Sequence, residues 1–252
     1  MFIHQQRVGY NVRKRIGGYV VDTPIVPPES EGDYEDLSTY TLAGVDQPGG
    51  FSVSTTKLTV TDFQAVHDDV YLYKDFTAGY FKATNCIINF ELNVVSMPQA
   101  LSDYCGVLSF SNSPGSNGGN TQDTVHVEIV PSYPAPRYDT FDPNHFQLWI
   151  TQGNWAGAYT IQDVGVTHYL TFTRDWAGGV AKGDINLSVY TDAARTILNT
   201  NHTNHWHRND ISAANGATTY QYLQVGYGTR VGHDATKVWN FTVDNVEIIT
   251  NE

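Results

Sequence analysis

From about residue 40 onward, the chain alternates apolar and polar residues over short stretches, with the two-residue period of β-strands. β-branched and aromatic side chains dominate these stretches, and turns rich in Gly, Pro and Asn separate them. No part of the sequence shows a convincing helical period. The pattern predicts an all-β fold, a two-sheet antiparallel β-sandwich. The predicted strands cover residues 51–55, 57–63, 69–76, 80–95, 105–112, 124–130, 145–151, 169–175, 185–192, 221–228 and 238–249.

Three regions differ in composition. Residues 1–23 are basic. Residues 24–36, "PIVPPESEGDYED", combine three prolines with five carboxylates. Residues 37–252 carry the strand pattern. Proline fixes φ and donates no hydrogen bond, so the second region is predicted to be an extended linker. The sandwich is therefore expected to begin at about residue 37, behind an extended N-terminal arm.

Charge is distributed unevenly along the chain. The first 20 residues hold four of the 14 Lys and Arg and no carboxylate, whereas the whole chain has 26 Asp and Glu and a net charge of −12. Such an arm suits docking along an acidic protein surface, while the acidic body argues against nucleic-acid binding. The residues expected to anchor the arm are Arg7, Tyr10, Arg13, Lys14, Arg15 and Tyr19.

Targeting and redox signals are sparse. No window approaches the roughly 20 apolar residues of a membrane span, and the N-terminus lacks the apolar core of a signal peptide. We therefore expect synthesis in the host cytoplasm, with no membrane partner.

Cys86 and Cys105 are too few for a disulfide framework, which leaves two buried thiols on neighbouring strands or one bridge between them.

Several phrases resemble a known family. The run "DVYLYKDFTAGYFKATNCIINFELNVV", then "CGVLSFSNS", "THYLTFTRDWAGG", "INLSVYTDAARTIL", "YQYLQVGYG" and "VWNFTVDNVEII", resembles the concanavalin A-like lectin and glucanase jelly roll, including its laminin-G-like members. The resemblance covers roughly residues 38–250 and extends to jelly rolls appended to tailed-bacteriophage surface proteins. It implies a fold that hosts lectins, glycosidases and structural modules.

The glucanase branch of that family carries the signature ExDxxE on one strand. Here "FELNVVS" matches Glu91 to the first position, but Asn93 and Ser96 stand where the other carboxylates belong. Retaining hydrolysis needs two carboxyls. The sequence therefore predicts a non-enzymatic protein, with a lyase using Tyr, His and Arg as an open alternative.

Two stretches are candidate metal sites. "RYDTFDPNHF" resembles the calcium loop of legume-type lectins through Asp139, Asp142 and Asn144, although a plain turn fits the same residues. In "HTNHWHRND", His205 and His207 would project to one face of an extended segment and start a transition-metal site. Calcium is the one cofactor left open, and solvated loop histidines are the alternative for the second stretch.

Tryptophans in the predicted loops are candidate glycan-binding residues. Trp155, Trp176 and Trp206 have polar or small neighbours, so their rings are available for stacking on a sugar or for anchoring a loop. Trp149 and Trp239, by contrast, have strand contexts that indicate core or sheet packing.

Together these features favour a virion structural protein of the decoration or fibre type. Residues 1–30 would join it to other virion proteins of the capsid or tail, and the sandwich would bind host-surface glycans. A spike-like homo-oligomer is left open. A soluble carbohydrate-binding module and a polysaccharide-degrading glycoside hydrolase or lyase are the alternatives.

Overall fold

The computed structural model describes residues 13–16, 19–22, 33–44, 50–63, 70–82, 84, 86–99, 105–114, 125–132, 141–152, 155–175, 184–199, 205–208, 219–228 and 238–250. The chain divides into two compact units, Met1–Asp33 and Tyr34–Glu252.

The first unit contains a β-hairpin. Strand β1 (Arg13–Ile16) pairs antiparallel with β2 (Tyr19–Asp22), and Ile16 lies opposite Tyr19. The intervening Gly-Gly dipeptide suits a two-residue hairpin connection. The expected anchoring residues Arg13, Lys14, Arg15 and Tyr19 thus lie on paired strands rather than in a fully extended arm, and Arg7 and Tyr10 fall outside the described residues. Their anchoring role stays a prediction.

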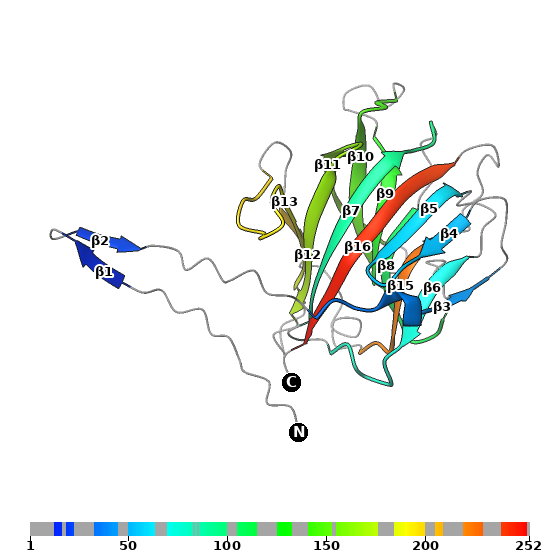
Figure 1. Cartoon of the computed structure of the whole chain (residues 1–252), viewed down its shortest axis with the longest axis horizontal. Helices are drawn as coiled ribbons and strands as arrows, with labels where there is room; N and C mark the ends of the chain where they lie inside the picture. Colours follow the sequence, from blue (N-terminus) through cyan, green and yellow to red (C-terminus); the bar gives the residue numbers. More distant parts are fainter. Residues whose placement is uncertain are drawn as a thin grey trace. The chain divides into compact units, whose positions relative to one another are not determined.

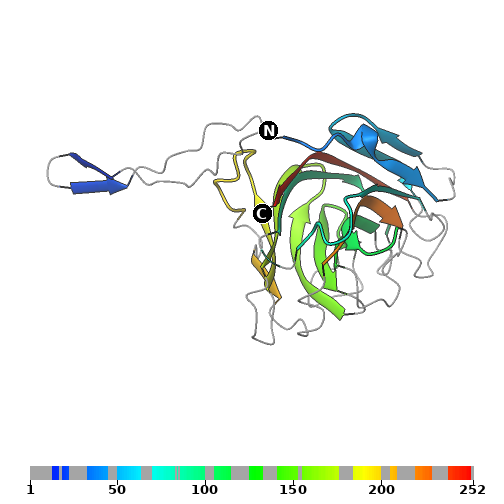
Figure 2. The same ribbon diagram turned by 90° about the horizontal axis from the view of Figure 1, so that it is seen from below.

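The second unit is a sandwich of two seven-stranded sheets, and all of its strand pairs are antiparallel (Figures 1 and 2). In spatial order, sheet I consists of β11 (Trp155–Asp163), β10 (His145–Gln152), β9 (Val125–Pro131), β8 (Cys105–Ser111), β15 (Tyr222–Gly228), β6 (Tyr71–Asp75) and β3 (Thr41–Ala43). Sheet II consists of β14 (His205–Arg208), β13 (Asp184–Tyr190), β12 (Thr167–Asp175), β7 (Cys86–Ser96), β16 (Trp239–Thr250), β5 (Lys57–Phe63) and β4 (Gly50–Val53). The predicted fold class is confirmed.

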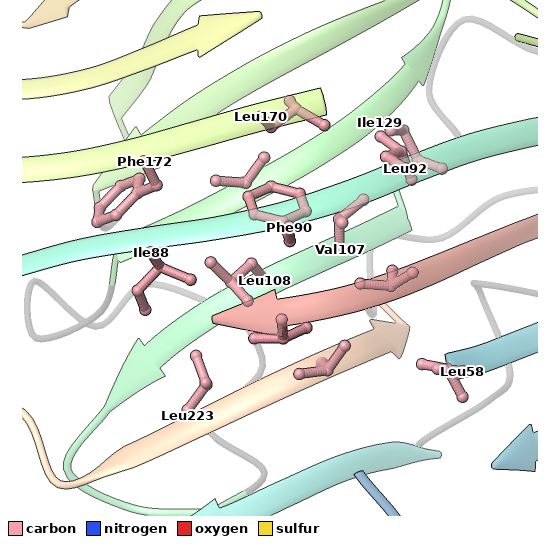
Figure 3. Close-up of a cluster of buried hydrophobic side chains, with 14 of the residues drawn as sticks. Leu58, Ile88, Phe90, Leu92, Val107, Leu108, Ile129, Leu170, Phe172 and Leu223 are labelled. Carbon is pink, nitrogen blue, oxygen red and sulfur yellow. The ribbon is translucent and has the colours of Figure 1, made fainter. Parts of the chain in front are cut away.

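The hydrophobic core lies between the two sheets. Along β7, buried residues alternate with partly exposed ones, so Ile88, Phe90 and Leu92 point inward. They meet Leu108 and Leu223 of sheet I in the cluster drawn in Figure 3. Trp239, for which core or sheet packing was predicted, is fully buried in this core. Along β7 the period-two pattern of the sequence thus coincides with the alternation of buried and partly exposed residues.

Both cysteines are buried thiols, as one of the two alternatives predicted, but they do not lie on neighbouring strands. Cys86 lies on β7 of sheet II and Cys105 on β8 of sheet I, so they belong to strands that are consecutive in the chain but not paired. Burial raises the pKa of the Cys86 thiol to about 12, which makes its reactive thiolate scarce.

Three strands of the sandwich were not predicted, namely β3, β11 and β14. Strand β11 reads "WAGAYTIQD", whose small residues hide the alternation, and β14 is only four residues long. Trp155 begins β11 and Trp206 lies in β14, so their prediction as loop residues is wrong. The predicted strand 80–95 is also too long, since β7 begins at Cys86.

Helices contribute little to the described part of the chain. Its one helical element is a single 3-10 turn, η1 (Leu37–Thr39), which Asp36 caps by accepting a hydrogen bond from the backbone N–H of Ser38. Within the same residues, no helix has the length and hydrophobicity needed to cross a membrane.

Candidate active site

The glycan candidates of the sequence lie on three different segments. The backbones of Trp155 and Trp206 are placed on β11 and β14, but their side chains, like the whole of Trp176, lie outside the described residues. Trp149 lies on β10 of sheet I and donates a hydrogen bond from Nε1 to Gln147 Oε1 (2.9 Å). The glycan-binding role of the first three residues stays a prediction.

The lectin-like loop forms a turn before β10. Asp142 accepts a hydrogen bond from the backbone N–H of Asn144 (2.9 Å) and pairs with His145 Nδ1 (2.6 Å). Burial alone would raise the pKa of Asp142, but these bonds hold it below its ordinary value. Both carboxylate oxygens therefore have partners within the chain, as a plain turn requires, and Asp139 falls outside the described residues.

The backbones of His205 and His207 lie on β14. The side chains of His205 and His207 are not among those described. In the part of the chain that is described, no group of three or more His, Cys, Asp or Glu is arranged to hold a metal ion.

Glu91, the partial match to the glucanase signature, lies on the outer face of sheet II. Its carboxylate accepts a hydrogen bond from Asn245 Nδ2 (2.9 Å), and its neighbour across the pairing is Asp244, which binds Lys57 (2.8 Å). These contacts tie together neighbouring strands and give Glu91 a structural role.

Sheet I has a second face that is both polar and buried. Every residue of β8 and β9 is buried, so these central strands are covered on both sides, unlike β7. Val125, Val127 and Ile129 face the core, and the residues between them, His126 and Glu128, face the other way. We call this second surface the polar face of sheet I. A buried polar face needs internal hydrogen bonds, because water is excluded from it.

A pair of β-bulges shapes the polar face. Gly226 is an extra residue of β15 relative to β6, and Val107 is an extra residue of β8 relative to β9. Gly226 has a φ of +66°, the left-handed conformation that glycine adopts readily. Without this bulge, Tyr227 would follow the alternation of Leu223 and Val225 into the core. The bulge instead turns Tyr227 onto the polar face.

Gly106 makes room for the tyrosine ring. It lies opposite Tyr227 on one side and opposite Glu128 on the other, and a Cβ at this position would overlap the Tyr227 ring. Glycine is therefore required here for close approach rather than for backbone freedom.

Tyr227 and His126 form the centre of the polar face. The Tyr227 hydroxyl lies 2.7 Å from His126 Nδ1, although the two residues are 101 positions apart in the chain. Both side chains are about 1% exposed. Burial lowers the pKa of His126 from 6.5 to about 3, so the imidazole is neutral at physiological pH.

Glu128 completes the group. Burial raises its pKa from 4.5 to about 7, and a hydrogen bond with the Tyr227 hydroxyl partly opposes that shift. Burial also raises the pKa of Tyr227 well above 10, with the charge of Glu128 adding to the effect. The face therefore holds a carboxyl that titrates near neutrality beside a phenol that keeps its proton, and such divergent pKa values are typical of an acid and base pair.

Partly exposed aromatic residues flank this buried group. Tyr71 of β6 pairs with Tyr227, and Trp149 of β10 pairs with Glu128. Directly paired residues of antiparallel strands share a face. A row across sheet I therefore runs from Tyr71 through Tyr227 and Glu128 to Trp149, with aromatic rings on both sides of the titratable groups.

The sequence predictions missed these residues. In "TVHVEIV" and "QYLQVGYG", polar residues alternate with apolar ones, which is also the pattern of an ordinary solvent-facing sheet surface. The available signal was glycine inside two predicted strands, at Gly106 and Gly226, because glycine there indicates a bulge or a close approach.

Comparisons with known proteins find similarity only at the level of solved structures. No family model matches the chain, and no curated protein matches its sequence. Among solved structures, an alginate lyase from Alteromonas sp. 272 has 12% identity and a TM-score of 0.47 over 85% of this chain and 96% of its own. Alginate lyase Aly36B has 14% identity and a TM-score of 0.48 over 89% and 95%. The binding domain of botulinum neurotoxin serotype D has 10% identity and a TM-score of 0.42 over 95% and 47%.

These findings correct the functional prediction made from the sequence. The similar structures named above include alginate lyases and no virion protein, which contradicts the prediction of a non-enzymatic decoration or fibre protein. The jelly-roll resemblance holds for the fold. At these identities and TM-scores the likeness assigns no activity to this chain.

Proposed function

We propose that the protein cleaves a uronic acid polysaccharide by β-elimination at the polar face of sheet I. One observation carries the proposal: the Tyr227 hydroxyl is held between His126 Nδ1, at 2.7 Å, and the Glu128 carboxyl. The activity named for the alginate lyases agrees with this reaction class.

The pKa values fit a division of roles. β-Elimination removes the proton from the carbon that bears the carboxylate, breaks the glycosidic bond on the next carbon and protonates the leaving oxygen. A carboxylate with a pKa of about 7 suits the base, and a phenol that stays protonated suits the acid. Glu128 takes the carbon proton and Tyr227 donates to the leaving oxygen.

The contact between the two groups closes the proton cycle. After cleavage, Glu128 holds a proton and Tyr227 lacks one, so transfer along their hydrogen bond restores both. Neutral His126 fixes the phenol in place through its own hydrogen bond. Burial keeps water away from the group, which strengthens each of these interactions.

Hydrolysis fits the face less well. Glycoside hydrolases use two carboxyls about 5 to 9.5 Å apart. Among the described residues of the polar-face strands, the other carboxylates are Asp75, four residues along β6 from Tyr71, and Asp163, which pairs with His145 four residues along β10 from Trp149. Four strand residues span about 13 Å, so neither carboxylate is close enough to Glu128 to act as its partner.

The decisive measurement is product formation on uronic acid polymers. Purified protein is incubated with alginate, with polygalacturonate and with a neutral glucan, and the conjugated unsaturated uronate is followed by ultraviolet absorbance. We expect product from a uronic acid polymer and none from the glucan. Release of reducing ends without the unsaturated product would indicate hydrolysis and contradict the proposal.

Removal of one oxygen tests the assigned acid. Tyr227→Phe should lower kcat by roughly 10²- to 10⁴-fold, the usual contribution of a positioned proton donor. Tyr169→Phe is the matched control, because Tyr169 lies on β12 of sheet II. If Tyr227→Phe kept wild-type kcat, the assignment of the site would be wrong.

A further inference from the structure

The polar face contains a buried glutamine whose side-chain carbonyl oxygen has no hydrogen-bond partner among the described residues. Gln224 of β15 is about 1% exposed. Its Nε2 donates a hydrogen bond to Ser111 Oγ (3.0 Å), whereas in the described part of the chain no donor reaches its Oε1. A buried acceptor without a partner costs free energy, and folded proteins rarely keep one.

The orientation of this amide is fixed by its neighbours. Ser111 donates its single hydroxyl proton to the backbone carbonyl of Ser113 (2.8 Å), so the hydroxyl oxygen can only accept from Gln224. The end of the amide that faces Ser111 must therefore be the NH₂ group. It follows that the end without a partner is the carbonyl oxygen.

Gln224 lies in the same row as His126, one row away from Tyr227 and Glu128. In the pairing, it is opposite Ser109, and Ser109 is opposite His126. Neighbouring rows on one face of a strand are about 7 Å apart, a separation that two adjacent sugars of a polymer can span. The amide is thus placed to contact the sugar next to the bond that Tyr227 and Glu128 would cleave.

We infer that Gln224 Oε1 accepts a hydrogen bond from a free hydroxyl of the polysaccharide, so that the site selects sugars unmodified at that position. This inference rests on the proposed function for the identity of the polymer. A hydroxyl supplies the missing donor, and an O-acetyl group in its place supplies none and adds bulk. A site that pairs a buried acceptor with a substrate hydroxyl discriminates strongly against analogues that lack it.

The test uses binding, so that it needs no turnover. Calorimetry compares Tyr227→Phe with the double variant Tyr227→Phe, Gln224→Met, using oligouronates with free and with acetylated hydroxyls. We expect the first protein to bind the free form roughly tenfold or more tightly than the acetylated form. In the double variant this preference should disappear. Equal preference in both proteins, or no binding by the first, would overturn the inference.

A stability control separates a binding role from a structural one. Gln162 is also fully buried, but both ends of its amide are paired: Nε2 donates to Thr160 (2.9 Å), and Oε1 accepts from Asn199 (2.9 Å). Gln162→Met should lower the urea midpoint, and Gln224→Met should leave it unchanged or raise it. A loss of stability in Gln224→Met equal to that in Gln162→Met would overturn the inference.

The two proposals fail in different ways. If the wild-type protein forms no unsaturated product, elimination is refuted, and the calorimetric preference for the free hydroxyl still decides the role of Gln224. If product forms and the preference does not depend on Gln224, only the inference about this residue is refuted.

Discussion

Glu128 shows how one residue on the polar face links stability to pH. Its pKa is raised from 4.5 to about 7, so over this window the folded protein holds a proton that the unfolded chain releases. The free energy of unfolding contributed by Glu128 therefore falls as the pH rises from 4.5 through 7, and it levels off above. His126 has the opposite sign, because its pKa is lowered from 6.5 to about 3, and its contribution rises over that range.

Glu128→Gln should abolish the fall in the free energy of unfolding that ionisation of Glu128 causes as the pH rises. Between about pH 5 and 8 the variant should gain about 2 to 3 kcal/mol in free energy of unfolding relative to wild type, because Gln stays neutral. Urea denaturation across this range measures the difference. Wild-type elimination activity should rise through the same window as the base ionises, and the variant should lack that rise. A pH-independent difference in stability would show that Glu128 does not titrate there.

At the scale of the element, strand β15 carries the geometry of the site. Its bulge at Gly226 turns Tyr227 toward His126, and the adjacent bulge in β8 keeps Gly106 beneath the ring. The two irregularities lie on neighbouring strands, so the phenol depends on both. Bulges that redirect a side chain in this way are common beside active sites.

Gly226→Ala should disturb this strand. The new Cβ would lie 2.7 Å from Leu58 Cδ2 and would require a positive φ, so we expect a loss of about 1 to 3 kcal/mol in free energy of unfolding and a marked fall in kcat.

Gly165→Ala is the control for backbone strain. Gly165 also has a positive φ (+79°), but a Cβ there meets no atom within 4 Å. The Gly165→Ala variant should lose about 1 kcal/mol in free energy of unfolding and keep wild-type kcat. Denaturant unfolding and steady-state kinetics on both variants give the comparison. Equal kinetic effects of the two substitutions would mean that the bulge has no special role.

A strand could be predicted from the sequence where its own residues alternate between apolar and polar. "KLTVTDF" alternates clearly and was predicted to its observed bounds, Lys57–Phe63. "WAGAYTIQD" has Gly and Ala where the alternation should appear, and "HWHR" is too short to show any. Their strands form because β10 and β13 provide paired backbones, which is information from elsewhere in the chain.

At the scale of the whole molecule, the sandwich contains its own core. The buried cluster extends from Leu37 to Val246, within the unit Tyr34–Glu252. The entry into this unit is tied down by a backbone hydrogen bond from Glu35 to Val246 (2.7 Å) and by a salt bridge between Glu35 and Lys74 (2.6 Å).

Removal of residues 1–32 should therefore leave the sandwich folded, with an unchanged melting temperature and unchanged elimination activity. Removal of residues 1–40 should lower the melting temperature, because it also deletes Leu37 and Tyr40 from the core. Thermal unfolding followed by circular dichroism distinguishes the two truncations. A large loss of stability in the shorter truncation would show that the first unit supports the second.

The sequence by itself determined the fold class and most of the long strands, because alternation is a local property of neighbouring residues. Tertiary structure decided the candidate site. Tyr227 meets His126 only because β15 and β9 both pair with β8 and a bulge reverses the direction of one side chain. Polar residues that looked solvent-facing, such as His126 and Gln224, are buried in the folded chain. Contacts between positions about 100 residues apart leave no local pattern from which they can be predicted.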